Sequence, residues 1–220
     1  MATCVICSGT QFGPAPGGRM AENGSAPLCL GCSSLERHRA GRAALNALRI
    51  REVFRDYRLL CFGLGEVAAK GWFSEADTHR APQPELYDPV ADTRPDGHYD
   101  VIACSHALEY VPDAKKAFGA LIRMLSPRGF MYLAYANPTA NEKSRDWSEP
   151  QAAQGGRYRI LGRDYERWFE RIAPEAIAMR IYNRDTATDS VQVSYILTKN
   201  PFWMRHTFAA DLDATILGIG

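Results

Sequence analysis

Residues 99–135 read YDVIACSHALEYVPDAKKAFGALIRMLSPRGFMYLAY and contain a strand, a helix and a second strand in succession. The apolar run over 99–106 is typical of a buried strand, and it ends in polar residues. An amphipathic helix over 112–125 follows, and a turn at Arg128 and Gly129 leads into the next apolar strand. Strands joined through a helix pack parallel in one sheet, so this stretch predicts an α/β fold with helices on both faces.

The same alternation of strands and helices extends outward from this stretch. Upstream, we expect a buried strand over 57–64, a helix over 65–75 and a short second strand at ELYDP, residues 85–89. Downstream, we expect a helix that opens at Asp164, and then two late strands, IAMRIYNRD and VQVSYILTK, paired as an antiparallel ribbon.

Length and composition limit the classes of protein to consider. The chain has 220 residues, 46% of them apolar and 23% charged, with a formal net charge of +1. This indicates one globular domain with a small appendage, and it disfavours a disordered chain or a general binder of nucleic acid. No apolar run approaches the roughly 20 residues of a membrane helix, and the N-terminus lacks the features of a signal peptide. We therefore expect a cytoplasmic protein that does not enter a membrane.

Four of the six cysteines form two CxxC pairs, Cys4 with Cys7 and Cys29 with Cys32. Four thiolates from two such knuckles can surround a zinc ion tetrahedrally and leave no position open for a substrate, so we expect a structural zinc site. The 21 residues between the pairs are rich in Gly, Pro, Ser and Asn, and metal binding would supply much of their folding energy. A redox switch built from the same pairs is the alternative interpretation.

A helix rich in arginine should connect this knuckle to the core. Seven arginines lie between residues 36 and 58, against three acidic residues. Such a local excess of positive charge could face an acidic ligand, although a solvated helix face explains most such runs.

Polar residues and glycines follow the predicted strands and mark a ligand site. Gly63 and Gly65 follow the strand over 57–64 and would let backbone N–H groups approach a ligand. Asp88, further along the chain at the end of ELYDP, could bind both hydroxyls of a ribose, and Asp92 could lie at the adenine side. The alternative role for either aspartate is that of a cap or turn residue.

The third strand end carries Ser105, His106 and Glu109. His106 could orient a substrate or act as a base, because imidazole titrates near neutral pH. It could instead cap the next helix or brace the sheet.

Two segments in the second half of the chain match no known motif: a polar stretch and an aromatic-rich tail. The polar stretch 137–157 is long for a loop and could act as a lid over the site. The tail 201–220 carries Phe202, Trp203 and Phe208, which either cover the core or form a homodimer contact.

With these motifs in place, the chain resembles a known family. The stretch 99–135 looks like the central part of class I methyltransferases that use S-adenosylmethionine, and CLGCSSLERHR resembles a bacterial subgroup in which a CxxC pair precedes SLERHR and the methyltransferase core. RYRILGRDYERWF resembles a late segment of that subgroup. The resemblance covers nearly residues 1–185, and it implies a Rossmann-like methyltransferase sheet with bound S-adenosylmethionine.

The resemblance also implies a role for individual residues. It implies that seven residues contact the cofactor: Gly63, Gly65 and Glu66 at the methionine part, Asp88 at the ribose, Asp92 near the adenine, and Ser105 and His106 beside the methyl donor. His106 is the expected catalytic base for an oxygen or nitrogen acid, with Tyr158 or Tyr165 as secondary candidates.

We therefore expect four segments: a zinc knuckle (1–35), a basic connecting helix (36–57), a methyltransferase-like domain (58–200) and a C-terminal tail (201–220). The expected function is methyl transfer to an unidentified small-molecule or peptide nucleophile. The first glycine loop departs from the family pattern, since Cys61 stands where an acidic residue is common and Val67 replaces a glycine. This departure motivates the alternative of a non-catalytic relative that docks a protein or nucleic acid through its knuckle and basic helix.

Overall fold

The computed structural model describes residues 2–53, 55–63, 67–80, 87–135 and 141–217. Its centre is a seven-stranded sheet with the order β11-β9-β10-β6-β5-β3-β4. In chain order the strands of this sheet are β3 (Arg58–Gly63), β4 (Glu75–Arg80), β5 (Tyr99–Ser105), β6 (Leu125–Ala134), β9 (Ile177–Arg184), β10 (Val191–Thr198) and β11 (Asp213–Ile216).

The sheet is parallel in one half and antiparallel in the other. β4, β3, β5 and β6 pair in parallel, whereas β10 runs antiparallel to β6, β9 to β10, and β11 to β9. The predicted α/β fold and the predicted antiparallel ribbon of β9 and β10 are both confirmed. The chain order reverses between β3 and β5, and a doubly wound sheet binds its ligands at the carboxyl ends of the strands at such a point.

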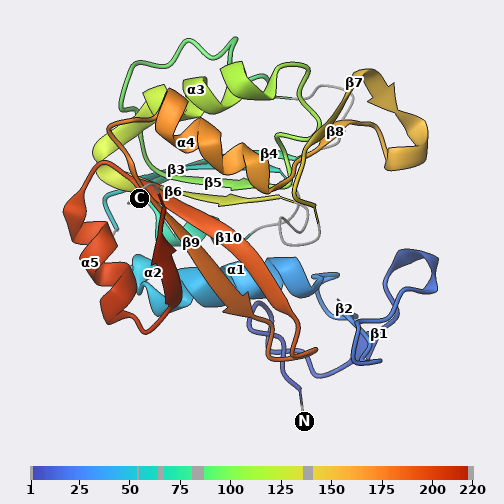
Figure 1. The fold of residues 1–220 in the computed structure, drawn as a ribbon. Coiled ribbons are helices and arrows are strands. Elements are labelled where there is room, and N and C mark those ends of the chain that lie inside the picture. Colours follow the sequence, from blue (N-terminus) through green and yellow to red (C-terminus); the bar gives the residue numbers. More distant parts are fainter. Residues whose placement is uncertain (1, 54, 64–66, 81–86, 136–140, 218–220) are drawn as a thin grey trace.

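Helices cover both faces of the sheet (Figure 1). One face carries α3 (Ala114–Met124) and α4 (Glu166–Ile172), and the other carries α1 (Glu36–Ala47), α2 (Ile50–Val53) and α5 (Pro201–Ala209). α3 begins at Asp113, whose side chain accepts a hydrogen bond from the Lys116 N–H at 3.0 Å and caps the helix. Phe118 and Leu121 on its inner side are fully buried against the sheet.

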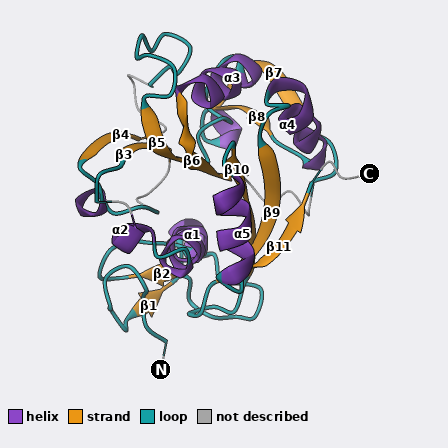
Figure 2. Ribbon diagram, turned by 90° about the vertical axis from the view of Figure 1, so that its left-hand side faces the viewer, coloured by secondary structure: helices purple, strands orange, loops and turns teal. Residues whose placement is uncertain are grey.

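α1 differs from the expected solvated basic helix. Arg39 and Arg42 are buried, at 1% and 7% exposed. Arg39 donates two hydrogen bonds to the Asp185 carboxylate, at 2.8 and 2.6 Å, and Arg42 donates to the Val67 carbonyl. The helix is therefore an internal element, end-on in Figure 2, and part of its arginine excess pairs inside the fold.

The chain after β3 also departs from expectation. Among the described residues of the predicted helix over 65–75, only Lys70–Trp72 are helical, as one 3-10 turn. The strand beside β3 is β4, Glu75–Arg80, and Tyr87–Pro89 of the predicted ELYDP strand lie outside any strand. β4 is an edge strand with half-exposed side chains, and its polar sequence EADTHR lacks the apolar run of a buried strand.

Two further segments take regular structure. Within the proposed lid, β7 (Arg145–Gln151) and β8 (Arg157–Ile160) form an antiparallel hairpin. The tail covers the core through α5 and β11, with Trp203 fully buried, while Phe202 and Phe208 remain exposed. No helix within the described ranges has the length and apolar character needed to span a membrane.

Candidate functional site

The carboxyl ends of β3 and β5 meet at the point where the strand order reverses. Gly63, the last residue of β3, pairs with Ser105, the last residue of β5. Gly63 has φ +127°, and a Cβ there would lie 1.9 Å from the Ser105 carbonyl oxygen. Only glycine fits this close approach of two backbones, so the position explains one glycine of the predicted loop. The other predicted loop residues, Gly65 and Glu66, lie outside the described residues.

The turn after β5 presents Ser105 and His106 at this edge. Ser105 is 2% exposed, and its Oγ has no hydrogen-bond partner among the described residues. His106 adopts φ +51°, and its N–H donates to the Ala134 carbonyl at 2.7 Å. A left-handed conformation is uncommon outside glycine, and here it occurs at the first residue after the end of β5. The predicted site residues of β3 and β5 are therefore brought together.

Glu109 lies behind His106 in the same turn. Its carboxylate is fully buried, and Oε1 lies 3.7 Å from His106 Nδ1. A carboxylate at this position would stabilise a protonated imidazole. His106 could therefore act as a base with the Glu109 carboxyl group as its acidic partner.

The two predicted aspartates occupy different environments. Asp88 is exposed, and its Oδ1 accepts a hydrogen bond from the Val90 N–H at 2.9 Å, as in an Asx turn. The Asp92 side chain is 4% exposed, and it accepts hydrogen bonds from the Tyr87 hydroxyl and from Arg94. Although burial acts in the opposite direction, these bonds lower the pKa of Asp92. Asp92 is thus held within a local network, whereas an oxygen of Asp88 remains accessible.

α1 adds a histidine that the sequence analysis did not select. His38 Nδ1 accepts a hydrogen bond from the Leu35 N–H at 3.1 Å, as the third helical residue of a capping box does. Burial, together with the charges of Arg37, His106 and Arg39, lowers the pKa of His38 to about 3. The ring is therefore neutral with its proton on Nε2, and that buried N–H has no partner among the described residues. No signal in the sequence distinguishes His38 from the surrounding basic run, and its burial becomes visible only in the packed fold.

The β7–β8 hairpin holds the turn after β5. The Tyr158 N–H donates to the Glu109 carbonyl at 2.8 Å. Arg159 is buried, and its guanidinium donates to the carbonyls of Leu108 and Pro112 at 3.0 and 2.8 Å. The hairpin therefore fixes the turn that follows β5 and carries Glu109, and the lid stays a prediction.

Tyr165, one of the secondary base candidates, belongs to the core. It is fully buried against Phe118, Phe169 and Trp168, and burial raises its pKa well above the ordinary value. A phenol in that environment stays protonated and would be a poor base.

The four predicted metal ligands come together in the N-terminal knuckle. All four Sγ atoms of Cys4, Cys7, Cys29 and Cys32 lie within 4.8 Å of one another. The Cys4–Cys32 and Cys7–Cys29 separations are 3.7 and 3.6 Å. A tetrahedral ion with metal–sulfur bonds of about 2.3 Å holds its sulfurs about 3.8 Å apart, so this geometry fits zinc.

Both knuckles have the same backbone form. Ser8 and Ser33, each directly after the second cysteine of a pair, have φ near +60°. The Ser8 and Ser33 N–H groups each donate to the carbonyl of the first cysteine in their pair, at 2.8 Å. The four thiols interact, and their pKa values move in opposite directions. Burial would raise the pKa of Cys4, but hydrogen bonds from Ser34 and from backbone N–H groups lower it, whereas the neighbouring cysteines raise the pKa of Cys7.

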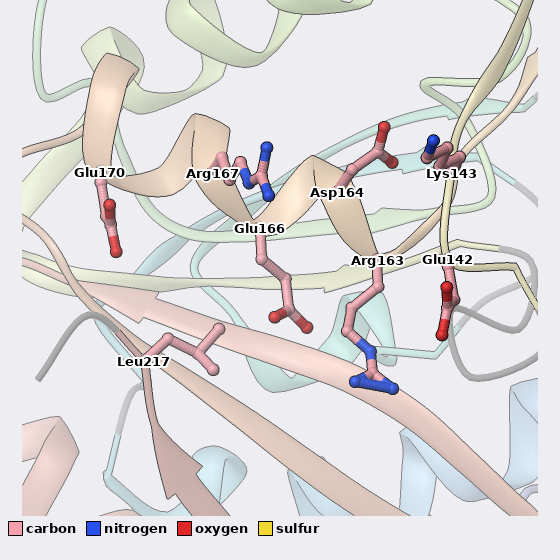
Figure 3. A pocket seen from close by; sticks show the side chains of 8 residues that line it. All are labelled: Glu142, Lys143, Arg163, Asp164, Glu166, Arg167, Glu170 and Leu217. Carbon is pink, nitrogen blue, oxygen red and sulfur yellow. The ribbon is translucent and has the colours of Figure 1, made fainter. Parts of the chain in front are cut away.

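A separate cleft of about 510 Å³ lies beside α4 (Figure 3). Two of its four acidic side chains are already engaged, since Glu166 accepts from Arg180 and Tyr195 at 2.8 Å, and Asp164 accepts from Ser144. None of the predicted cofactor residues lines this cleft, whose walls are Glu142, Lys143, Arg163, Asp164, Glu166, Arg167, Glu170 and Leu217.

Comparison with known proteins supplies a family. Residues 25–173, more than half of the chain, match the model of a family described as methyltransferase domain. No curated protein matches the sequence. Among solved structures, the YcgJ protein of Bacillus subtilis is 16% identical with a TM-score of 0.46, over 63% of this chain and 70% of the other.

A second solved structure is the 1,6-didemethyltoxoflavin-N1-methyltransferase of Burkholderia thailandensis, which contains 1,6-didemethyltoxoflavin and S-adenosylhomocysteine. It is 14% identical with a TM-score of 0.48, over 73% of this chain and 78% of the other.

Proposed function

The chain belongs to the methyltransferase domain family, and from this premise we propose that it transfers a methyl group from S-adenosylmethionine to a small-molecule or peptide nucleophile. The observation that carries the proposal is the junction of Gly63 with Ser105 and His106 at the point where the strand order reverses. A ligand that lies across the ends of β3 and β5 would meet glycine backbone on one side and polar side chains on the other.

The residues present fit the cofactor. Ser105 Oγ is a buried hydroxyl without a partner among the described residues, as expected of a group that binds a ligand. We assign Gly63 to the methionine part, Asp88 to the ribose, and Ser105 and His106 to the region beside the sulfonium. When bound, S-adenosylmethionine supplies an electrophilic methyl group.

The chain itself would orient the acceptor and receive its proton. His106 is the proposed base, and the nearby Glu109 carboxylate at 3.7 Å would stabilise the imidazolium that results. The buried turn excludes water from this side, because Leu108 and Val111 are at most 2% exposed. Positioning and exclusion of water contribute most of the rate in such a transfer, so no further nucleophile is required.

We further propose that the knuckle holds a structural zinc ion. Four cysteines would complete its coordination, which leaves no position for a substrate. The knuckle lies against the amino end of α1, where Arg39 donates to the carbonyls of Pro27 and Ser34 at 2.8 and 2.9 Å. The metal would therefore support the helix rather than the chemistry. The burial of Arg39 and Arg42 weakens the alternative of a docking surface formed by a basic helix.

Calorimetric titration with S-adenosylhomocysteine tests the cofactor assignment. We expect saturable binding by the zinc-loaded chain and a loss of about tenfold or more in affinity for Asp88→Ala, because a charge-assisted hydrogen bond is removed. Asp96→Ala is the matched control, since Asp96 is an exposed aspartate whose partner is Arg123. Absence of binding by the folded wild type would refute the proposed function.

The role of His106 is tested by methyl transfer from labelled S-adenosylmethionine to a panel of acceptors. His106→Ala should lower kcat by about 10²- to 10⁴-fold, the usual contribution of a general base, with S-adenosylhomocysteine affinity retained. An unchanged kcat would exclude His106 as the base.

A further inference from the structure

Arg37, in the first turn of α1, forms no ion pair with the residues that the structure describes. Arg37 makes no hydrogen bond or ion pair with any residue that the structure describes, and its Nε is closed to solvent. Its neighbour Glu36 is already bound by Arg19 through two hydrogen bonds of 2.7 and 2.9 Å. A guanidinium that gives up water without gaining a partner is costly, so the position suggests an anionic ligand.

A second arginine approaches from the β7–β8 hairpin. The Cζ atom of Arg157 lies 5.4 Å from the centre of the Tyr110 ring. One of its terminal nitrogens donates to the Gln154 carbonyl at 2.9 Å, while its Nε is buried and has no partner within the described segments. Burial lowers the pKa of Arg37, the charge of Glu36 opposes that shift, and the positive charges of Arg19 and Arg157 lower the pKa further, so Arg157 acts on Arg37 through its charge. The charges of both also act on Tyr110.

The two arginines adjoin the proposed reaction site. Tyr110 follows Glu109 directly, and the hairpin that carries Arg157 is tied to the Glu109 carbonyl through the Tyr158 N–H. Arg37 precedes His38, whose Nε2–H lacks a partner among the described residues and whose pKa responds to the charge of His106. Buried donors without a partner among the described residues therefore come from α1 and from the β7–β8 hairpin, and Figure 1 shows the amino end of α1 and the hairpin on the same side of the molecule.

We propose that Arg37 and Arg157 bind an anionic group, a carboxylate or a phosphate, of the methyl acceptor and so place its nucleophile beside His106. This inference rests on the proposed methyltransferase function and specifies its substrate class. Guanidinium groups present planar forks of donors that match both carboxylate and phosphate oxygens. The neutral His38 adds an uncharged N–H donor beside them.

The acceptor accounts for this pair of arginines better than the cofactor does. The methionine part of the cofactor is assigned to Gly63 after β3, whereas Tyr110 and Arg157 belong to the turn after β5 and to the hairpin that covers it. The proposed anion site therefore lies on the side of His106 from which an acceptor would approach.

The test uses zinc-loaded full-length protein saturated with S-adenosylhomocysteine, with inorganic phosphate and acetate as separate probes. Binding is followed through the Nε–Hε NMR signals of the arginines. The signals of Arg37 and Arg157 should shift together and saturate at one apparent Kd. The probe with the lower Kd identifies phosphate or carboxylate as the preferred group.

Substitutions determine whether these arginines carry the binding. Arg37→Gln and Arg157→Gln should each raise the Kd about tenfold or more, and Arg37→Lys should raise it less, because it keeps the charge but loses the fork. Arg205→Gln, an exposed arginine of α5, is the matched control and should leave the Kd unchanged. Thermal unfolding of each variant verifies that it remains folded.

Three results would overturn the inference. Anion shifts that the two substitutions leave unchanged would exclude the site. Anion binding that S-adenosylhomocysteine abolishes would assign the arginines to the carboxylate of the cofactor. If the folded protein does not bind S-adenosylhomocysteine at all, the proposed function itself fails, and an anion site that still requires Arg37 and Arg157 would belong to another class of ligand.

Discussion

The cysteine knuckle is built from residues close together in the sequence, whereas the site at the ends of β3 and β5, here called the strand-end site, is built from residues far apart in the sequence. In the knuckle, each pair of ligands is two residues apart, and its turn is closed by hydrogen bonds within six residues, such as Cys4 to Gly9. In the strand-end site, Gly63 meets Ser105 through sheet register, and His38 arrives on a helix from another face. The first is a local structure whose four cysteines could be joined by a metal ion, whereas the second exists only when the sheet has formed.

The contact between the two regions is concentrated at the start of α1. Ser34 lies 3.4 Å from Cys4 Sγ and 3.2 Å from Cys32 Sγ, and Arg39 joins the Ser34 carbonyl to Asp185 in the core. Between Ser34 and Arg39 stand Arg37 and His38, and the pKa of His38 responds to the charge of His106. The SLERHR segment therefore connects the cysteine cluster to the core and to the proposed acceptor site.

Loss of a metal ligand should have the largest effect. Cys29→Ser removes one of four thiolates, and we expect loss of bound zinc and a fall of more than about 4 kcal/mol in the free energy of unfolding, because metal binding supplies the folding energy of the knuckle. Zinc content and urea denaturation provide the measurement.

Cys104→Ser is the matched control, since Cys104 is buried in β5 outside the cluster and should leave the zinc content unchanged. If Cys29→Ser kept both its zinc and its stability, the account of the knuckle would be wrong.

Breaking the link at Arg39 should have the next largest effect. Arg39→Ala leaves the Asp185 carboxylate, 1% exposed, without its partner, and removal of one member of a buried ion pair costs about 3–5 kcal/mol. Arg184→Ala removes the adjacent ion pair with Asp189, whose side chains are 59% and 72% exposed, and should cost less than about 1 kcal/mol. Equal losses in the two variants would contradict the assignment of Arg39 as the link.

The protonation of His38 should have no effect on stability at neutral pH and an effect confined to a defined window of lower pH. In the unfolded chain the histidine pKa is near 6.5, whereas in the fold the pKa of His38 is about 3, so the unfolded state binds more protons between these values. Stability is therefore unaffected above pH 6.5 and falls with decreasing pH, by up to about 1.4 kcal/mol per pH unit from this residue.

His38→Gln preserves the capping acceptor and removes this titration, so its stability should fall less steeply between about pH 6 and about pH 4. Denaturation at several pH values gives the two slopes. Identical slopes would show that His38 is not buried as a neutral group.

Features that depend on residues close together in the sequence were predicted better than features that depend on long-range packing. Cysteine spacing predicted the metal cluster, and apolar runs predicted β3, β5 and β6 together with the ribbon of β9 and β10. The polar edge strand β4 was missed because its side chains face solvent, and the charged β7–β8 hairpin was interpreted as a loop for the same reason.

Contacts over long sequence separations were not accessible from the pattern. Arg39 and Asp185 are 146 positions apart, and nothing in either segment indicates the other. Similarly, Arg37 and His38 looked like members of a solvated basic run, and only the packing of α1 on the sheet directs them toward the turn that carries His106. Sequence motifs identified the strand ends, whereas tertiary packing supplied the groups around them.

Amide chemical-shift mapping with S-adenosylhomocysteine tests the central claim most directly, because it locates the ligand on the molecule. The account predicts that the amides of Gly63, Ser105 and His106 shift and saturate together, while those of Arg167 and Glu170 in the cleft beside α4 remain in place. Shifts confined to the cleft beside α4, or none in the folded protein, would contradict the assignment of the cofactor to the ends of β3 and β5.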